Sequence, residues 1–457
     1  MNYGFFAVVG NRDTNVSKIA NMNFKSCTLT LPDFSAINRA WALCVGLNKG
    51  ATLSNINMTD CKIAFNVRPA GAAGTAGSPA ANIGMIAGTQ TGGRMTKCTT
   101  TGGEIGRLNE VFASNNNALG LSIGGIVGLA GGGAVIDSCA NVSTPVGSYM
   151  SGGGVIGLCD ASLPIQVIQC YNKATVTATT GTSGGGVGGL IGGITASAVG
   201  ELQIDHCWNS GDVGYLQSGG TSRMGGIIGD SQSATATLTM KQCFNSGHIY
   251  YYYPAGGSLT GMATRVLLIG GLGGTLVSNQ NGVQQCVISD CYNAGAVTLE
   301  ITGFTGAVAL FASGNGGVGG IGGWINGGNT DTRGYVRNTY NSGEVKVLLT
   351  GASSVTVNAV GVLFGRSTST QGQQPFSNLV YTSGKTSVES TPVTAITGAF
   401  NGTATAYTDG FYEFTDFSSQ AAFEGLNDNG NSYDFANIWE MGAGYPILRG
   451  LYGNPAQ

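Results

Sequence analysis

The chain has 457 residues, of which 79 are glycine, 42% are hydrophobic and only 9% are charged. Glycine at more than twice its usual share of about 7%, without a G-X-Y period, excludes collagen, and the ordinary apolar fraction argues against disorder. The net charge of −3 without a basic patch disfavours nucleic acid as a partner, and only two histidines, His206 and His248, disfavour histidine catalysis or a zinc site.

The first residues, MNYGFFAVVGN, carry neither a basic region nor a cleavage site, so we expect no signal peptide in this segment and a start inside a repeat. The uncharged stretch 184–200, GGGVGGLIGGITASAVG, has the small-residue spacing of some membrane helices. The same glycine pattern recurs along the whole chain, however, so we expect no membrane span here.

Two short blocks alternate over about residues 1–390. The first is a glycine-apolar pentad, which recurs as GFFAVVG from Gly4, ALCVG from Ala42, IGMIAG from Ile83, IGGIVG from Ile123, GGVIG from Gly153, GGLIGG from Gly188, GGIIG from Gly225, IGGLGG from Ile269, GGIGG from Gly319 and VGVLFG from Val360. The second is a cysteine block such as CYNAGAVT, centred on Cys27, Cys61, Cys98, Cys139, Cys170, Cys207, Cys243 and Cys291 and degenerating to Thr339 and Val380. A drifting period of this size is typical of solenoid repeats, which recur every 20–50 residues.

Each block is short, rich in β-branched residues and bounded by glycine, asparagine or serine, which favours strands. In a helix, each of these glycines would cost about 1 kcal/mol. We therefore expect three strands per repeat: one carries the pentad, one enters the cysteine block, and a third begins at residues such as Val213, Ile249, Val297 and Val345. Stacked repeats of this kind form an all-β, right-handed parallel β-helix of about ten glycine-rich repeats, with insertions such as 250–267 after the third strand.

In such a stack each residue meets its own copies about 4.8 Å above and below. The cysteines are predicted to form a buried inner column, including Cys139, Cys170, Cys207, Cys243 and Cys291. The asparagines two positions later are predicted to form an amide ladder in which each donates to the next, over Asn141, Asn172, Asn209, Asn245, Asn293 and Asn341. We expect the glycine of the NSG turn to adopt a positive φ, and the pentad glycines to let one face pack closely on another.

These blocks resemble the GLUG-type repeats of bacterial surface proteins, in which a glycine-apolar pentad is followed by an N-C-Y-N-T-G-x-V segment. The resemblance is close at GGIIG with CFNSGHI, GGLIGG with CWNSGDV and GGIGG with TYNSGEV, and weaker where Thr28, Lys62 and Thr99 replace the aromatic residue. The segment FANIWEMGAGYPILRGL from Phe435 is also similar to the segment that closes such arrays. The resemblance implies an extracellular or cell-surface location and an adhesive role, without naming a ligand.

Residues 400–457 are expected to form the small cap that a solenoid needs at its end, within a division into an array over 1–395 and a capping segment over 396–457. The sequence SSQAAFEGLNDNG predicts one short helix, with Ser418 or Ser419 as N-cap and a stop over 427–430. The segment NDNGNSYD, 427–434, faintly resembles a calcium loop but lacks the leading aspartate and the closing glutamate, so we interpret it as a turn.

The eleven cysteines leave three alternatives: a reduced buried thiol column, some disulfides, or a metal site. Stacked cysteines lie within disulfide range by Cα distance, but the count is odd and Cys44, Cys159 and Cys286 lie outside the column. No C-x-x-C occurs, so a metal site is the least favoured of the three, and we predict no metal and no cofactor.

Aromatic residues offer the candidate ligand-binding positions. Residues following the cysteines form a stripe, Tyr171, Trp208, Phe244, Tyr292, Tyr340 and Tyr381, which either stacks on sugar rings as an exposed face or packs against neighbouring segments. The run YYYY lies in a predicted insertion loop, where tyrosines either bind a partner or fold back on the solenoid. The predicted ligand-binding residues are Tyr250, Tyr251, Tyr252, Tyr253, Trp208, Tyr292 and Tyr340.

For a carbohydrate-active enzyme the candidate carboxylates are Asp205, Asp212 and Asp230, which no spacing argument brings together. The sequence therefore favours a non-catalytic, adhesin-like extracellular surface protein that binds a host, bacterial or cell-surface glycan or protein through its loops and one solenoid face. A structural stalk or filament subunit, from a bacterial or phage fibre and with self-association along the fibre, is the first alternative. A β-helix enzyme is the second.

Overall fold

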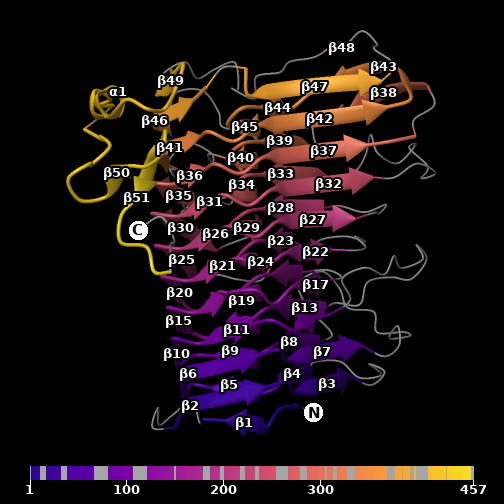
Figure 1. Ribbon diagram of the computed structural model, residues 1–457, viewed down its shortest axis with the longest axis vertical. Coiled ribbons are helices and arrows are strands. Elements are labelled where there is room, and N and C mark those ends of the chain that lie inside the picture. Colours follow the sequence, from indigo (N-terminus) through magenta and orange to yellow (C-terminus); the bar gives the residue numbers. More distant parts are fainter. Residues whose placement is uncertain are drawn as a thin grey trace.

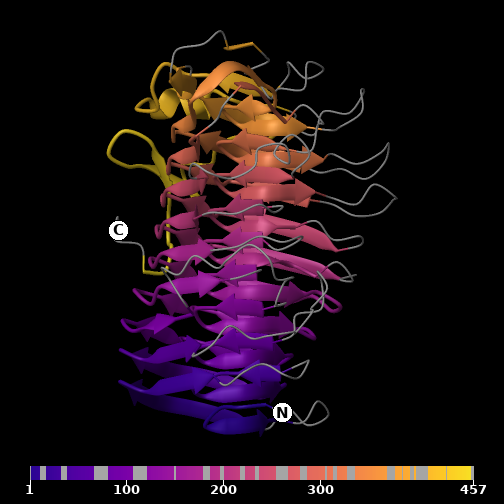
Figure 2. The ribbon, with the colours of Figure 1, turned by 90° about the vertical axis from the view of Figure 1, so that its right-hand side faces the viewer.

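The computed structural model describes residues 2–10, 17–31, 39–65, 81–106, 121–148, 151–178, 186–195, 200–216, 222–231, 236–253, 266–277, 286–303, 306–311, 316–326, 335–367, 376–382, 384–391, 396–397, 410–428 and 430–453. These residues form a parallel β-helix whose coils stack along one axis, from the N-terminal strands at one end to the last repeats at the other (Figures 1 and 2). Four columns of parallel strands run along the stack, and we name them sheets A to D in the order in which a coil visits them.

Sheets A and B hold the strands on either side of the pentad. Sheet A consists of β4 (Arg39–Trp41), β8 (Ala81–Gly84), β13 (Leu121–Gly124), β18 (Ser151–Gly153), β23 (Gly186–Gly188), β28 (Ser222–Gly225), β33 (Leu267–Gly270), β39 (Gly317–Gly319) and β44 (Val360–Gly361). Sheet B consists of β1 (Phe6–Val9), β5 (Val45–Lys49), β9 (Ala87–Thr91), β14 (Val127–Gly131), β19 (Ile156–Asp160), β24 (Ile191–Ile194), β29 (Ile228–Asp230), β34 (Gly273–Val277), β40 (Gly322–Asn326) and β45 (Phe364–Ser367). The expectation of one strand per pentad is therefore wrong, because the pentad bends between two short strands.

Sheet C holds the cysteine block. It consists of β2 (Lys18–Lys25), β6 (Thr52–Thr59), β10 (Arg94–Thr96), β11 (Thr99–Thr101), β15 (Val135–Asp137), β16 (Ala140–Asn141), β20 (Ile165–Ile168), β21 (Tyr171–Asn172), β25 (Glu201–Asp205), β26 (Trp208–Asn209), β30 (Thr237–Lys241), β31 (Phe244–Asn245), β35 (Cys286–Ser289), β36 (Tyr292–Asn293), β41 (Tyr335–Asn341), β46 (Phe376–Tyr381) and β49 (Phe411–Glu413). Each coil bends this sheet at one position, where a residue takes a left-handed conformation with φ near +50°: Asn21, Asn55, Lys97, Ser138, Gln169, His206, Gln242, Asp290, Asn338 and Asn378.

Sheet D follows the NSG turn. It consists of β3 (Thr28–Leu31), β7 (Lys62–Phe65), β12 (Glu104–Ile105), β17 (Val146–Ser148), β22 (Val176–Ala178), β27 (Val213–Leu216), β32 (Ile249–Tyr253), β37 (Val297–Ile301), β42 (Val345–Thr350) and β47 (Thr386–Thr391). The predicted starts of the third strand at Val213, Ile249, Val297 and Val345 are confirmed. A small parallel sheet, β38 (Gly306–Leu310), β43 (Ala352–Val357) and β48 (Ile396–Thr397), adds to the last coils.

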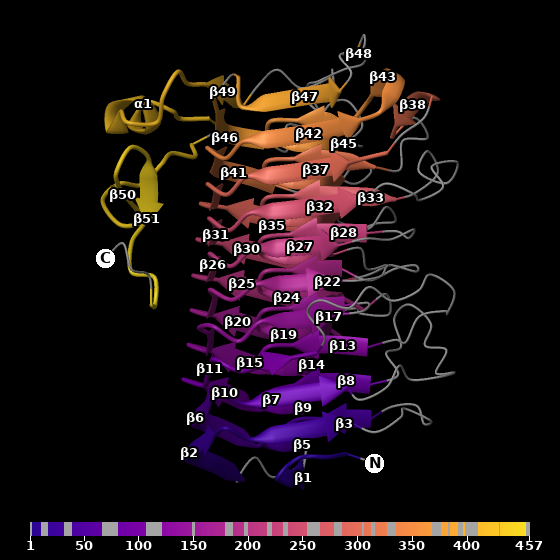
Figure 3. The ribbon, with the colours of Figure 1, turned by 45° about the vertical axis from the view of Figure 1, so that its right-hand side comes forward.

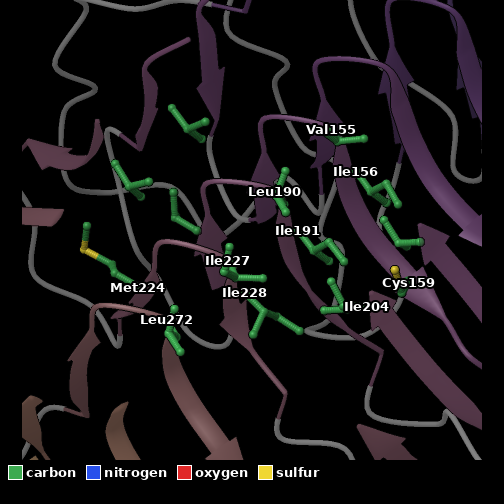
Figure 4. Close-up of a cluster of buried hydrophobic side chains, with 14 of the residues drawn as sticks. Val155, Ile156, Cys159, Leu190, Ile191, Ile204, Met224, Ile227, Ile228 and Leu272 are labelled. Atoms are coloured by element: carbon green, nitrogen blue, oxygen red, sulfur yellow. The ribbon is translucent and has the colours of Figure 1, made fainter. Parts of the chain in front are cut away.

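The pentad glycines serve close packing, as the sequence predicted. A Cβ on Gly229 would lie 2.2 Å from the backbone nitrogen of Val187 in the preceding coil, and a Cβ on Gly226 would lie 2.2 Å from the Asn245 carboxamide carbon. Both distances are far inside van der Waals contact, so neither position accepts a side chain. The apolar pair between these glycines points into the interior, where successive pairs such as Ile227 and Ile228 form a continuous row (Figure 4).

The cysteine column and the asparagine ladder are both present. Cys139, Cys170, Cys207, Cys243 and Cys291 are buried, and all eleven cysteines are free thiols. Cys27 and Cys61 lie outside the column, at the corner between sheets C and D, because the register places Cys98 above Ile56. Each ladder asparagine donates its Nδ2 to the Oδ1 of the next at 2.7–2.8 Å, in the order Asn172, Asn209, Asn245, Asn293 and Asn341. Asn141, the other predicted member, donates to the Thr144 carbonyl at 2.9 Å instead. The last copy shifts by one residue from the prediction: Leu379 and Val380 take the cysteine and aromatic positions, and Tyr381 aligns with Asn341.

The glycine of the NSG turn does not have the predicted positive φ. The backbone φ is not positive at any of the four described turn glycines, Gly211, Gly247, Gly295 and Gly343. A Cβ on Gly247 would instead lie 2.1 Å from the Gly211 carbonyl oxygen, and a Cβ on Gly295 would lie 2.0 Å from the Gly247 oxygen. Glycine is required at this position because the turns of successive coils stack with no room for a side chain.

The C-terminal segment lies along the side of the stack. After β49, helix α1 (Gln420–Glu424) begins at Ser419, whose side chain accepts a hydrogen bond from Ala422 N, as predicted for one of the two candidate caps, and ends earlier than predicted, at Gly425. The antiparallel pair β50 (Trp439–Met441) and β51 (Pro446–Leu448) follows, and the chain then runs back along sheet C (Figures 1 and 3). We call residues 414–428 and 430–453 the lateral strap, because they cover a side of the solenoid, whereas the sequence predicts a cap at its end.

Candidate functional site

The aromatic stripe on sheet C is covered by the lateral strap. Its rings stack in parallel, with centroid distances of 4.6 Å from Tyr171 to Trp208, 5.5 Å from Trp208 to Phe244, 4.8 Å from Phe244 to Tyr292 and 5.1 Å from Tyr292 to Tyr340. Strap residues pack on these rings as one hydrophobic cluster: Phe417, Phe423, Leu426, Tyr433, Phe435, Trp439, Ile447, Leu448 and Leu451. Hydrogen bonds join the two layers, including Tyr340 Oη to the Pro446 carbonyl.

Three of the predicted ligand-binding residues are consequently buried. Trp208, Tyr292 and Tyr340 are at most 3% exposed, so the stripe does not offer an open face to a ligand. The second alternative, packing against a neighbouring segment, describes the structure. The stripe position loses its aromatic residue in the coils below the strap, where the register places Thr99, Asn57 and Asn23, all exposed or half-buried. Thr28 and Lys62 follow their cysteines in the sequence but lie in sheet D, outside the stripe.

The segment 427–434, interpreted as a turn, attaches the strap to sheet C. Asp428 accepts hydrogen bonds from Tyr412 Oη at 2.6 Å and from Asn378 N at 3.2 Å, and the Asn378 carboxamide donates to the Asn431 carbonyl at 2.8 Å. Within the part of the chain that the structure describes, no group of three or more histidine, cysteine or carboxylate side chains could hold a metal ion.

The tyrosine run lies in a strand, where a loop was predicted. β32 alternates between the two faces of sheet D, so Tyr251 and Tyr253 are buried at 1% and 6% exposure, whereas Tyr250 and Tyr252 lie half-buried on the outer face. The predicted loop therefore begins only after Tyr253, and residues 254–265 lie outside the described residues. A strand beginning with inward Ile249 already implies this alternation, because side chains change faces with period two.

Polar groups surround the two outward tyrosines. The Tyr250 ring lies over Gly214 of the coil below, where a Cβ would be 2.1 Å from Cζ. His248 lies beside it, with 5.4 Å between ring centroids, and its Nε2 is 2.9 Å from Thr298 Oγ1. Above the tyrosines, Thr298 pairs with Tyr250 and Glu300 with Tyr252 in register. We call this surface the sheet D face.

The sheet D face is acidic. Asp212 and Glu344 are exposed at the adjoining corner and Glu300 is half-buried, whereas the cation Lys346 pairs with Glu389 at 2.8 Å. Burial, together with the charge of Asp212, raises the pKa of Tyr250, so this hydroxyl stays protonated and can donate a hydrogen bond at neutral pH. Two aromatic rings beside carboxylates and hydroxyls can stack on a sugar and hydrogen-bond its hydroxyl groups. No sequence motif marks Thr298, Glu300 and Lys346, because only the coil register brings them to these tyrosines.

The three candidate catalytic carboxylates do not share a site. Asp205 ends β25 of sheet C and lies 2.9 Å from His206 Nδ1, Asp212 is exposed at the corner before sheet D, and Asp230 is buried in sheet B. Asp230 Oδ2 accepts from Arg223 Nη1 at 2.5 Å and Oδ1 accepts from Thr275 Oγ1 at 2.5 Å, so it forms an internal ion pair.

Comparisons with protein-family models, curated proteins and solved structures find no significant match for this chain. The similarity to GLUG-type repeats therefore rests on the repeat motif alone. Among the described residues, no helix has the length and apolar character needed to cross a membrane.

Proposed function

We propose that this chain is a non-catalytic, adhesin-like surface protein that binds a glycan through the sheet D face. The observation that carries the proposal is the outward position of Tyr250 and Tyr252 on a flat sheet, flanked by His248, Thr298 and Glu300. The motif resemblance supports an extracellular location. The surrounding carboxylates favour a neutral glycan, since an anionic one would meet Asp212, Glu300 and Glu344.

A glycan array with the purified chain tests this proposal. The Tyr250→Ala/Tyr252→Ala variant removes both rings from an outer face, so we expect it to fold and to lose binding of neutral glycans. Phe5→Ala is the matched control, because Phe5 is a 70% exposed aromatic residue outside sheet D. Binding that survives in the double variant, or the absence of glycan binding by the folded parent, would contradict the proposal.

A stalk or filament subunit is the second candidate, and the N-terminal coil favours it. Strands β1, β2 and β3 pair only with the coil above among the described residues, and Phe5 and Val8 are 70% and 50% exposed. In the last coil, by contrast, the inward side chains are buried: Val360 and Phe364 are at most 2% exposed. Light scattering of the chain and of Val8→Glu distinguishes the candidates: a filament subunit forms concentration-dependent assemblies that this charge disrupts, whereas a glycan-binding monomer does not.

A further inference from the structure

Cys27 differs from the other ten cysteines in its exposure. It is half-buried in the first coil, while the rest are buried in the interior. Its Sγ contacts the Lys25 carbonyl oxygen at 3.5 Å in an exposed hydrogen bond. Among the described residues, β2 and β3 pair only with the coil above, and Cys27 lies at the corner between them.

Cys61 lies directly above Cys27. The register pairs Lys25 with Thr59 and Thr28 with Lys62, and Ser26 and Asp60 have nearly equal φ values of 52° and 51°, so the two cysteines project alike from adjacent coils. The coil spacing of about 4.8 Å falls within the Cα separation of about 4.4–6.8 Å that disulfides span.

The Cys61 sulfur also leans toward the first coil. Its Sγ donates to the Phe24 carbonyl at 3.5 Å as well as to the Thr59 carbonyl of its own coil at 3.4 Å. The Lys62 N–H donates to the Cys27 carbonyl at 2.8 Å, so the backbones at the two cysteines are hydrogen-bonded neighbours. The Cα separation and the direction of the Cys61 sulfur together suit a disulfide between the two coils.

We propose that Cys27 and Cys61 are a redox-active pair, in which Cys27 reacts first with a small-molecule disulfide and Cys61 resolves the product. In the first step Cys27 loses its proton to solvent and its sulfur attacks one sulfur of the oxidant. The oxidant's disulfide bond breaks, a mixed disulfide forms on Cys27, and one thiolate leaves. In the second step Cys61 loses its proton and attacks Cys27 Sγ, the mixed disulfide breaks, and the second thiolate leaves. Two protein thiols are oxidised and one oxidant disulfide is reduced to two thiols.

The cross-link would close the most exposed coil of the array. It would join β2 and β3 to β6 and β7, where the interior side chains Phe24 and Leu29 are only half-buried. Disulfides stabilise chiefly by restricting the unfolded chain. Burial raises the pKa of Cys61, so the second step should accelerate as pH rises, while the mixed disulfide on Cys27 accumulates at lower pH. The inference is independent of glycan binding.

The test treats the native, reduced chain with oxidised glutathione and maps the peptides by mass spectrometry over time. We expect an adduct at Cys27 that rises and then falls, a Cys27–Cys61 cross-link that replaces it, and loss of two of the eleven thiols. In Cys61→Ser the Cys27 adduct should persist, and in Cys27→Ser neither product should form. Cys98→Ser is the control, because Cys98 belongs to the inner column and is fully buried, and it should behave like the parent.

The wild-type time course is decisive even if a column variant fails to fold. An unreactive Cys27, or a mixed disulfide that never converts to the cross-link in the parent chain, would overturn the proposal. Cross-linking of Cys98 to Cys139 as fast as Cys27 to Cys61 would do so too, because both partners of that pair are fully buried.

Discussion

Trp208 donates its indole N–H to the backbone carbonyl of Tyr452 at 2.9 Å, across 244 positions of the sequence. This bond fastens the end of the lateral strap to the middle of the aromatic stripe. The strap therefore stabilises the side of the solenoid over several coils, and the stripe consists of aromatic residues only where the strap covers it.

Trp208→Phe should keep the ring stack and lose this one hydrogen bond, at a cost of about 1 kcal/mol in the free energy of unfolding. Trp208→Ala should cost about 3–5 kcal/mol, because it also leaves a cavity between Tyr171 and Phe244. Urea denaturation measures both costs, and hydrogen exchange of strand β51 reports whether the strap loosens. Thr99→Ala, at the stripe position of an uncovered coil, removes one half-buried hydroxyl and should cost only about 1 kcal/mol. Equal costs for the alanine variants at 208 and 99 would contradict a stabilising strap.

Asp290 should make stability depend on pH under the strap. Burial raises the pKa of this carboxyl above its usual 3.8, against the opposing effects of Asn338 and the nearby cation Arg337. A raised folded-state pKa means that the protonated form favours folding, so this contribution is present below the unfolded pKa and is lost as pH rises through the folded pKa. Asp290→Asn, which keeps an acceptor for Asn338 Nδ2, should therefore gain stability relative to the parent as pH rises above 4.

Asp416 is the control of opposite sign for this measurement. Hydrogen bonds from Ser418 lower the pKa of its exposed carboxyl, so its contribution is present above the unfolded pKa and is lost as pH falls. Asp416→Asn should accordingly lose stability relative to the parent only at the higher pH. Denaturation series from pH 3 to pH 7 check both variants. A difference in the free energy of unfolding between Asp290→Asn and the parent that does not change with pH would show that burial does not destabilise the ionised carboxylate.

The stacking of the coils could be predicted from the sequence, but the position of the lateral strap on sheet C could not. Repeats in register meet their own copies, so the starts of β27, β32, β37 and β42 and the asparagine ladder followed from spacing alone. The strap contact joins Trp208 to a residue 244 positions away, and no local pattern encodes which outward face such a segment selects.

The errors at glycine and tyrosine have physical causes as well. An NSG turn suggests a positive φ, yet in a stack the approach of the Gly211 carbonyl already excludes a side chain at Gly247. Similarly, four consecutive tyrosines suggest a contact loop, but their alternating burial continues the strand that begins at Ile249. The sheet D face was thus half predicted: two of its tyrosines were named, but not their neighbours in the coils above and below.

A buried asparagine-to-asparagine hydrogen bond should contribute more to the free energy of unfolding than an exposed one. Asn245 is fully buried; it donates to Asn293 Oδ1 and to the Gly247 carbonyl and accepts from Asn209. Asn245→Ala leaves these partners unsatisfied in the interior, and we expect a loss of about 2–4 kcal/mol. The control is Asn57→Ala, which breaks an asparagine-to-asparagine bond of 3.0 Å to the exposed Asn23 on the outer face of sheet C, and water should limit its cost to about 1 kcal/mol. Equal losses by chemical denaturation would refute a role for burial.

Gly247 offers a test of why the turn needs glycine. If a positive φ were the reason, asparagine, which tolerates that conformation, would be accepted better than alanine. Because the obstacle is the Gly211 carbonyl 2.1 Å from any Cβ, Gly247→Ala and Gly247→Asn should both destabilise the chain by about 3 kcal/mol or more. Gly425→Ala is the control: this glycine ends α1 with φ −70° and its nearest contact would be 3.3 Å, so the change should cost less than about 0.5 kcal/mol. Tolerance of asparagine but not of alanine at 247 would restore the conformational explanation.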